Sequence, residues 1–241
     1  TIQESNGQAQ KEAQGEQLAA IMSEIIKVAG QVNKKAKKLW LDNVPPIVLT
    51  DQIETKYAIK HTPYNVTATL GEFDAPELQQ QGPVTYNLIE DENLLICGTD
   101  GAERENLLTS LIYSVCKNHT SDEVNFYSID YGSESLRMFM SLPHFGGMVF
   151  TGELEKYTNL IKIINNETTK RKKLFIDYGG DYQNYIKNSG QKLPLKVIII
   201  NNYDTLKEDI ESSFEEMPEL LRDSARYGII YIITANGMNS T

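Results

Sequence analysis

Cysteine and histidine are scarce in this 241-residue chain, which has two of the first and three of the second. Cys97 and Cys116 both lie in apolar segments, so we expect buried, reduced thiols rather than a disulfide or a metal site. The histidines are His61, His119 and His144, and their segments lack the spacing of metal ligands. The sequence therefore predicts no metal site and no disulfide framework.

Long apolar runs and an excess of positive charge are also absent. No apolar run approaches the ~20 residues that span a bilayer, and the polar N-terminus predicts no signal peptide. The formal net charge of −10 argues against nucleic acid as the main ligand, because binding to phosphates requires a basic face. Hydrophobic residues make up 40% of the chain, which is enough to build a core. We expect a soluble piece of chain made in the cytosol.

The N-terminal segment differs in composition from the rest. Residues 1–17 are rich in Gln, Glu and Gly, which is typical of a linker or of the polar start of a helix. The next apolar residues have helical spacing and predict an amphipathic helix that ends near the basic run 34–38: Leu18, Ile21, Met22, Ile25, Ile26 and Ala29. Trp40, the only tryptophan, is interpreted as a structural anchor. We assign residues 1–44 to a linker and lead-in helix, and residues 45–241 to a folded domain.

The body of the chain alternates between strands and helices, after short strands and turns expected over residues 45–93. Apolar runs predict strands at 94–97, 124–129, 148–150, 197–200 and 229–234. Helical spacing predicts helices at 103–118, 153–175 and 210–227. This alternation predicts a three-layer α/β fold with a mainly parallel sheet covered on both faces. Ligands of such folds bind beyond the carboxyl ends of the strands.

The segment after the first of these strands has the outline of a phosphate-binding loop. A working loop reads G-x-x-x-x-G-K-[ST], in which backbone N–H groups and a Lys surround the phosphates and a hydroxyl binds Mg²⁺. Counted from Gly98, the chain has Glu103, Arg104 and Glu105 where Gly, Lys and Ser or Thr belong. The other loop positions are Thr99, Asp100, Gly101 and Ala102.

These departures from the loop pattern oppose phosphate binding. Arg104 keeps a positive charge, although its planar fork is bulkier than an ammonium group. A carboxylate ~4 Å from a phosphate repels it by about 4 kcal/mol at an effective dielectric constant of about 20. Glu103 and Glu105 are themselves anions that suit a helix N-terminus, so they are able to act as internal phosphate mimics.

The second half of such a site is a strand that ends in Asp-Asp or Asp-Glu, which hold the metal and position water. Here the strand ends in Asn201 and Asn202, whose amides form hydrogen bonds but cannot act as bases. One interpretation is that neither stretch ever bound a nucleotide. Their order on an α/β alternation favours a vestigial nucleotide site in an ancestral NTPase core. We predict no catalytic residue and no metal ligand at these positions.

Further motifs follow the loop in a fixed order. They are VNFYSID, the LPH of SLPHFGGMVF, the basic helix end TKRKKLF, the INNYD segment and the closing strand YGIIYIITAN. With the loop itself, they make residues 45–241 resemble an FtsK/SpoIIIE-type ATPase domain. The lead-in helix with KLWLDNVPP resembles the linker before the repeated modules of the EssC/EccC family, the membrane ATPases of type VII secretion. The decayed loop and INNYD resemble the C-terminal module of that family.

The resemblance implies a P-loop NTPase core of the RecA/FtsK type in a cytoplasmic domain of a cell-membrane protein. The implied partners are other ATPase modules of the same chain and exported WXG100-type proteins, within an oligomeric assembly and without nucleic acid. The parent family uses ATP and Mg²⁺, but no cofactor is expected for this module, which would recognise substrate or regulate its neighbours. The alternative is an active ATP-binding motor unit that neighbouring modules complete.

Three polar or aromatic features carry weaker signals. The basic run 168–173 is either an anion or DNA patch or a solvated helix end, and we favour the helix end. Tyr178, Tyr182 and Tyr185 suit an interface and helix packing equally well. The acidic residues within 208–216 are interpreted as a solvated surface.

Overall fold

The computed structural model describes residues 2–32, 41–99, 101–131, 133–210 and 221–237. The chain forms two compact units, one of Thr1–Asp42 with Pro76–Gln80 and one of Asn43–Ala75 with Gln81–Thr241. The first unit contains the long helix α1 (Ile2–Val32) and the short 3₁₀ helix η1 (Pro76–Leu78). The predicted lead-in helix is therefore confirmed, and the polar residues before it belong to the same helix. The basic run 34–38 and Trp40 lie outside the described residues.

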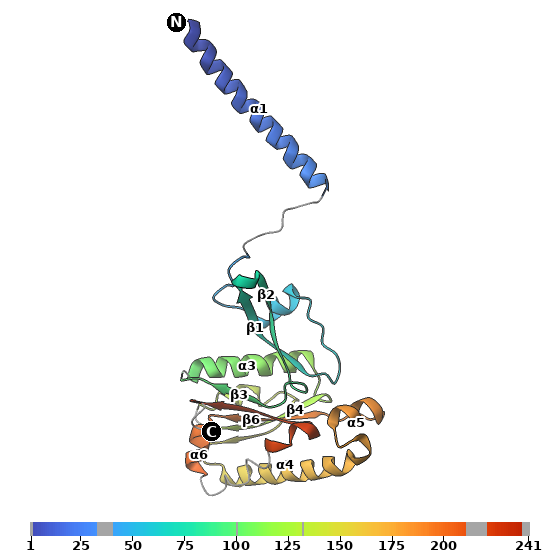
Figure 1. Cartoon of the computed structure of the whole chain (residues 1–241). Helices are drawn as coiled ribbons and strands as arrows, with labels where there is room; N and C mark the ends of the chain where they lie inside the picture. The colour runs from blue at the N-terminus through green and yellow to red at the C-terminus, as the bar shows by residue number, and fades with distance from the viewer. Residues whose placement is uncertain (1, 33–40, 100, 132, 211–220, 238–241) are drawn as a thin grey trace. The chain divides into compact units, whose positions relative to one another are not determined.

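The second unit is built on a five-stranded parallel sheet (Figure 1). Its strands are β3 (Leu94–Cys97), β4 (Val124–Asp130), β5 (Phe145–Phe150), β6 (Leu195–Asn201) and β7 (Ile229–Ala235). Their spatial order is β3-β7-β6-β4-β5, and every pair of neighbours is parallel. All five predicted strands are confirmed, because apolar runs bounded by polar turns are a local signal for buried parallel strands.

Helices cover both faces of the sheet, as the alternation predicted. On one face α3 (Gly101–Asn118) packs Leu108, Leu111 and Ile112 against the strands. On the other face α4 (Leu154–Leu174) packs Tyr157 and Leu160. Figure 1 shows α3 and α4 on opposite sides of the sheet, so the three-layer fold is confirmed.

Smaller elements complete this unit. The two-stranded sheet of β1 (Thr67–Ala75) and β2 (Gln80–Asn87) confirms the short strands expected in this region, where α2 (Thr50–Lys56) was not predicted. Residues of β1 join the core on the outer side of α3, away from the large sheet (Figure 1). The helix α5 (Tyr182–Asn188) begins where the Asp181 carboxylate accepts a hydrogen bond from the Asn184 backbone N–H. Two further 3₁₀ helices are η2 (Ser135–Phe139) and η3 (Ile176–Tyr178).

The helix predicted at 210–227 is confirmed at residues 221 and 222, which are helical, but it is wrong at both of its ends. The helix α6 (Tyr203–Asp209) ends where the prediction begins, because Ile210 leaves the helical conformation and packs into the core beside β6 and β7. Near the other end, η5 (Ala225–Tyr227) is a 3₁₀ helix, and Gly228 stops it at a φ of +67°. Residues 211–220 lie outside the described part of the chain.

Tertiary packing also decides the two open interpretations of polar and aromatic residues. Tyr182 and Tyr185 are buried and pack against Phe175 with their rings tilted, so the tyrosine cluster is helix packing. The basic run is an exposed helix end at Lys170 and Lys172, but Arg171 between them is only 1% exposed. Its guanidinium is therefore a core group, which neither interpretation of the run foresaw.

Candidate functional site

The predicted site residues come together at the carboxyl edge of the sheet, beside the N-terminus of α3. Strand β7 lies between β3, which leads into the loop, and β6, which leads into the Asn pair. In the register of the sheet, Cys97 is level with Ala235, and Asp130 is level with Asn201. Because all five strands are parallel, their carboxyl ends meet at one edge, which is where ligands of this architecture bind.

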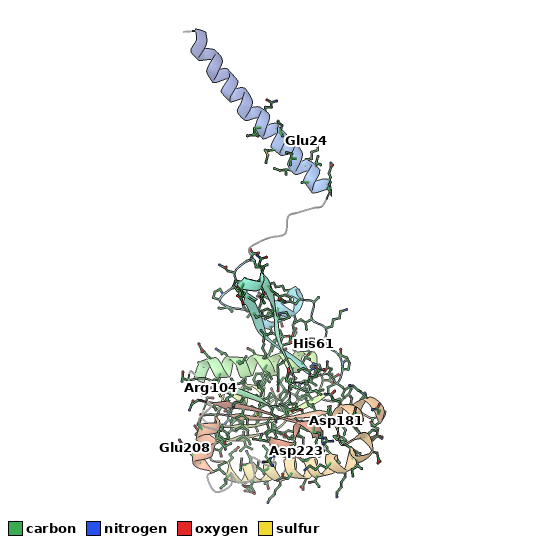
Figure 2. The ribbon with its side chains drawn as sticks, viewed as in Figure 1. Glu24, His61, Arg104, Asp181, Glu208 and Asp223 are labelled. Carbon is green, nitrogen blue, oxygen red and sulfur yellow. The ribbon has the colours of Figure 1, made fainter. Side chains whose placement is uncertain are left out.

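The loop is closed by its own arginine. The Arg104 Nη1 donates to the Gly98 carbonyl and, at 2.8 Å, to the Asn236 Oδ1. The Asn236 backbone N–H donates in turn to the Asp204 carboxylate at 2.7 Å, which links α3, the end of β7 and α6. Figure 2 shows Arg104 at the loop end of α3. The guanidinium thus hydrogen-bonds the protein where a loop Lys would reach for phosphate.

The other loop residues lie around this arginine. Gly98 follows β3, its N–H donates to the Ala235 carbonyl at 3.2 Å, and Gly101 begins α3. Thr99, Ala102 and Glu103 are exposed, and Glu105 is partly buried. Asp100 lies outside the described residues. The prediction of a buried thiol at the end of β3 is wrong, because Cys97 is exposed, although both cysteines are free.

The Asn pair takes part in a hydrogen-bond network below the loop. The Asn201 Nδ2 donates to the Asp130 Oδ1 at 2.9 Å, and the Asn201 Oδ1 accepts from the Thr234 hydroxyl at 2.7 Å. The Asn202 backbone N–H donates to the same Thr234 oxygen at 2.8 Å. Asn202 itself adopts a left-handed φ of +66°, which asparagine tolerates better than most residues, and α6 begins after it. Asn201 therefore acts as a structural crosslink between three strands.

Asp130 is a site residue that the sequence reasoning missed. It ends β4, is 0% exposed, and accepts from the Leu136 backbone N–H at 2.9 Å as well as from Asn201. Burial raises the pKa of its carboxyl, and the negative charges of Glu105 and Glu134 act in the same direction. A carboxylate directly after a buried strand is the signal that would have found it, by the rule that drew attention to Asn201.

Arg104 and Asn201 use their polar side-chain groups for hydrogen bonds within the protein. Arg104 satisfies carbonyl and amide oxygens, and Asn201 uses both ends of its amide within the protein. Asp130 is the carboxylate of this network that could exchange a proton, since amides do not. Within the described residues, no group of three or more His, Cys, Asp or Glu side chains is arranged to hold a metal ion. None of the described helices is long and apolar enough to cross a membrane.

Comparison with known proteins gives one consistent result. The sequence profile of the FtsK/SpoIIIE family matches residues 56–236. The "Type VII secretion system protein EssC" of Staphylococcus aureus (strain Mu50) is 28% identical over 95% of this chain, which spans 16% of that protein. The "ESX secretion system protein EccC" of Geobacillus thermodenitrificans is 26% identical over 91% of the chain, which spans 14% of it.

Solved structures agree with the sequence relatives. The structure of EssC ATPases 2 and 3 from Geobacillus thermodenitrificans superposes with a TM-score of 0.73 and 25% identity, over 83% of this chain and 37% of that one. The structure of Thermomonospora curvata EccC ATPases 2 and 3 in complex with a signal sequence peptide has a TM-score of 0.64 and 22% identity, and it covers 74% of this chain and 34% of that one. The profile match covers most of the chain. The chain therefore belongs to the FtsK/SpoIIIE family.

Proposed function

We propose that this chain is a non-catalytic cytoplasmic module of a type VII secretion ATPase, which recognises exported protein or regulates the neighbouring modules. The observation that carries the proposal is the closed loop, in which Arg104 hydrogen-bonds Gly98 and Asn236. A loop that binds its own side chain has to break those bonds before a phosphate can enter. The position of the module as the C-terminal one of its protein, and its assembly with other ATPase modules, belong to the same proposal.

The residues at the site are a poor fit for a magnesium-bound triphosphate. Carboxylates at Glu103 and Glu105 stand at the helix end that would face the phosphates, and each adds repulsion. The amide of Asn201 replaces the carboxylate that would hold Mg²⁺, and its oxygen is bound by Thr234. We infer no step of hydrolysis at this site and assign no catalytic residue.

A module without catalysis can still bind a partner, and an apolar cleft on the face of the sheet that α4 covers supports a binding role. A cleft of about 280 Å³ lies between α4 and strands β4, β6 and β7. Isoleucines of α4 and the sheet line it together with two lysines: Ile163, Ile164, Ile198, Ile229, Lys170 and Lys196. A helical WXG100-type protein can lay an amphipathic helix into a groove of this kind. One EccC structure of this fold contains a signal sequence peptide.

Nucleotide titration of the 241-residue chain tests the loss of the nucleotide site. We expect calorimetry with ATP and Mg²⁺ to show weak binding or none, and a micromolar Mg²⁺-dependent affinity would overturn the proposal. The triple variant Glu103→Gly, Arg104→Lys, Glu105→Ser serves as the matched comparison. It should bind phosphate better than the wild type and still fail to turn over ATP.

Secretion by the full-length ATPase tests the binding role. Deleting residues 45–241 should abolish or redirect export of a WXG100-type protein while hydrolysis by the upstream modules persists. The Asn201→Ala, Asn202→Ala double variant should reduce export far less. If that folded double variant stopped export as completely as the deletion, the vestigial site would be functional and the proposal would fail.

A matched pair of variants on α4 tests whether the cleft is the binding surface. Ile163 lines the cleft and Leu154 does not, yet both side chains are 55% exposed, so neither change to aspartate should unfold the domain. Ile163→Asp should lower export at least severalfold, and Leu154→Asp should leave it near the wild-type level. Equal effects of the two changes would place the binding surface elsewhere.

The second candidate function is an active motor unit completed by a neighbouring module, and Asp130 is the observation in its favour. Its buried carboxylate lies within hydrogen-bonding distance of Asn201, at the edge where a base would be needed. If the triple loop variant hydrolyses ATP, and an added Asp130→Asn change abolishes that activity, this second function is correct.

A further inference from the structure

The three histidines, unrelated in sequence, gather at one place in the fold. The His61 and His119 ring centroids are 5.6 Å apart, with the ring planes at 88°. The His144 Nε2 donates to the His119 carbonyl at 2.8 Å. Figure 2 shows His61 near the C-terminal end of α3, at the opposite end of that helix from Arg104. The cluster is therefore separate from the loop site.

The cluster lies where the N-terminal part of the domain attaches to α3. We call the residues 50–70, which include α2 and the start of β1, the lead-in clamp. Two hydrogen bonds attach the clamp to α3. The Thr69 N–H of the clamp donates to the Ser114 Oγ at 2.8 Å, and the Asn118 Nδ2 of α3 donates to the Glu54 Oε1 of the clamp at 2.8 Å. The Lys117 ammonium also lies 3.0 Å from the Glu54 carboxylate. These contacts attach the clamp along the second half of α3.

His119 supplies the next contact of this series, and the contact fixes its protonation state. The Thr67 backbone N–H donates to the His119 Nε2 at 3.2 Å, so that nitrogen carries a lone pair. The His119 Nδ1 lies 3.3 Å from the Glu123 Oε2 and donates to it, while the same oxygen accepts from the Thr120 N–H at 2.9 Å. His119 is thus a neutral imidazole with its proton on Nδ1. A second proton on Nε2 would point at the Thr67 N–H and break this contact.

Burial is the largest influence on that second proton, and it opposes the charged form. His119 is only 4% exposed, and burial lowers the pKa of its imidazole. His61 lowers this pKa as well. The Glu123 carboxylate on its own loop favours the charge. From α2, the Glu54 carboxylate lies 3.5 Å from the His61 ring, and from the loop before β5, the His144 ring donates to the His119 carbonyl. Lys117, two residues before His119, pairs with Asp51 at 2.5 Å and with Glu54 at 3.0 Å.

We propose that His119 is a proton-operated latch for the lead-in clamp. In the closed state its unprotonated Nε2 holds β1 on the end of α3. When the clamp opens, the imidazole reaches water and takes a proton that the closed state cannot accommodate, so acid favours opening. Opening uncovers Val66 and Ala68, which are fully buried in the core beside α3. The latch couples the acidity of the surroundings to access to this face of α3.

Amide hydrogen exchange of the 241-residue chain tests the latch. In the open state His119 has its ordinary pKa of about 6.5. One proton taken up on opening therefore lowers the protection of the Thr67 and Thr69 amides by up to about tenfold from pH 7.5 to pH 5.5. These values are corrected for the intrinsic pH dependence of exchange. The Ile199 amide in the central strand β6 is the internal reference and should change little.

Two glutamine variants assign the effect to one histidine. In His119→Gln, the amide oxygen can accept from Thr67 and the amide N–H can donate to Glu123, but the side chain cannot be protonated. This variant should lose the pH-dependent change in protection at Thr67. His144→Gln is the control, because the His144 ring donates to the His119 carbonyl while the Thr67 N–H donates to His119; this variant should keep the pH-dependent change.

Each result decides the proposal. Protection at Thr67 that stays constant from pH 7.5 to pH 5.5 in the wild type overturns the latch, and so does an unchanged pH dependence in a folded His119→Gln variant. If that variant does not fold, the His119 ring signals in the wild-type NMR spectrum give the decision. The latch requires that their titration midpoint lie below 6.5, and a midpoint at or above that value refutes it.

Discussion

Replacing Arg171 with methionine removes a buried guanidinium that links three segments of the domain: α4, the stretch before β6 and the stretch before β7. Its Nε donates to the Glu167 carboxylate at 2.8 Å, and its Nη2 donates to the Pro194 carbonyl at 2.7 Å. Its Nη1 donates to the carbonyls of Tyr227 and Gly228, at 3.0 and 2.9 Å. Methionine fills much of the same space without any donor. The change therefore tests the hydrogen bonds rather than the packing.

The loss in the free energy of unfolding depends on which hydrogen-bond acceptors of Arg171 are left without a donor. The Gly228 carbonyl keeps a hydrogen bond from the Lys196 N–H at 2.9 Å, and the Glu167 side chain is 26% exposed, so water can solvate it. The carbonyls of Pro194 and Tyr227 lose their donor, at about 1–3 kcal/mol each when buried. Breaking a buried ion pair by removing one partner costs about 3–5 kcal/mol. The two carbonyls together cost about 2–6 kcal/mol. The ion-pair figure lies inside that range, so we expect a loss of roughly 3–5 kcal/mol in the free energy of unfolding.

Urea denaturation followed by circular dichroism measures this loss directly. For a chain of this length, the change should also lower the Tm by roughly 6–20 °C. Lys173, two residues further along α4, is exposed, so Lys173→Met should alter the free energy of unfolding by no more than about 0.5 kcal/mol. A loss below about 1 kcal/mol in Arg171→Met would refute the view that this arginine holds the segments together.

Three further changes have outcomes that the structure fixes. Gly228→Ala should lower the free energy of unfolding by more than about 2 kcal/mol in the same assay, because φ is +67° and the new Cβ would lie 2.5 Å from the Tyr182 ring. Iodoacetamide at pH 8 should modify Cys97 and spare Cys116 in a mass spectrum of the folded chain, since Cys97 is exposed and burial raises the pKa of the Cys116 thiol to about 12. Modification of both thiols at equal rates would contradict this. Thr234→Val should cost about 1–3 kcal/mol by removing the hydroxyl that bridges Asn201 and Asn202 at the end of β6, and a thermally neutral variant would contradict the network.

The layers of the fold could be predicted from the sequence because their signals are local. An apolar run of four to eight residues or a 3.6-residue period requires only neighbouring side chains to be compared. All five strands of the large sheet, α3 and α4 were found in this way. The ends of the helix predicted at 210–227 were wrong, because Ile210 is buried in the core and Gly228 adopts a left-handed conformation.

The candidate site was found in part, and the missing part has a physical reason. Position after a strand drew attention to Asn201, since parallel strands end at one edge of the sheet. The same rule applies to Asp130, but only the strand order shows that β4 lies next to β6 and that these two side chains meet. Loss of the loop pattern at 103–105 was visible in the sequence, whereas the contact of Arg104 with Asn236 joins residues 132 positions apart.

The sequence by itself determined the alternation of elements, the edge of the sheet where the site lies and the family resemblance. Only the tertiary structure decided which side chains form hydrogen bonds and contacts with one another. Arg171 appeared to be one more residue of a basic run, and the fold buries it among backbone carbonyls. The three histidines had no common spacing, yet chain segments 25 to 83 residues apart bring them together. Contacts between distant segments depend on how the layers pack, and no local pattern of residues encodes that packing.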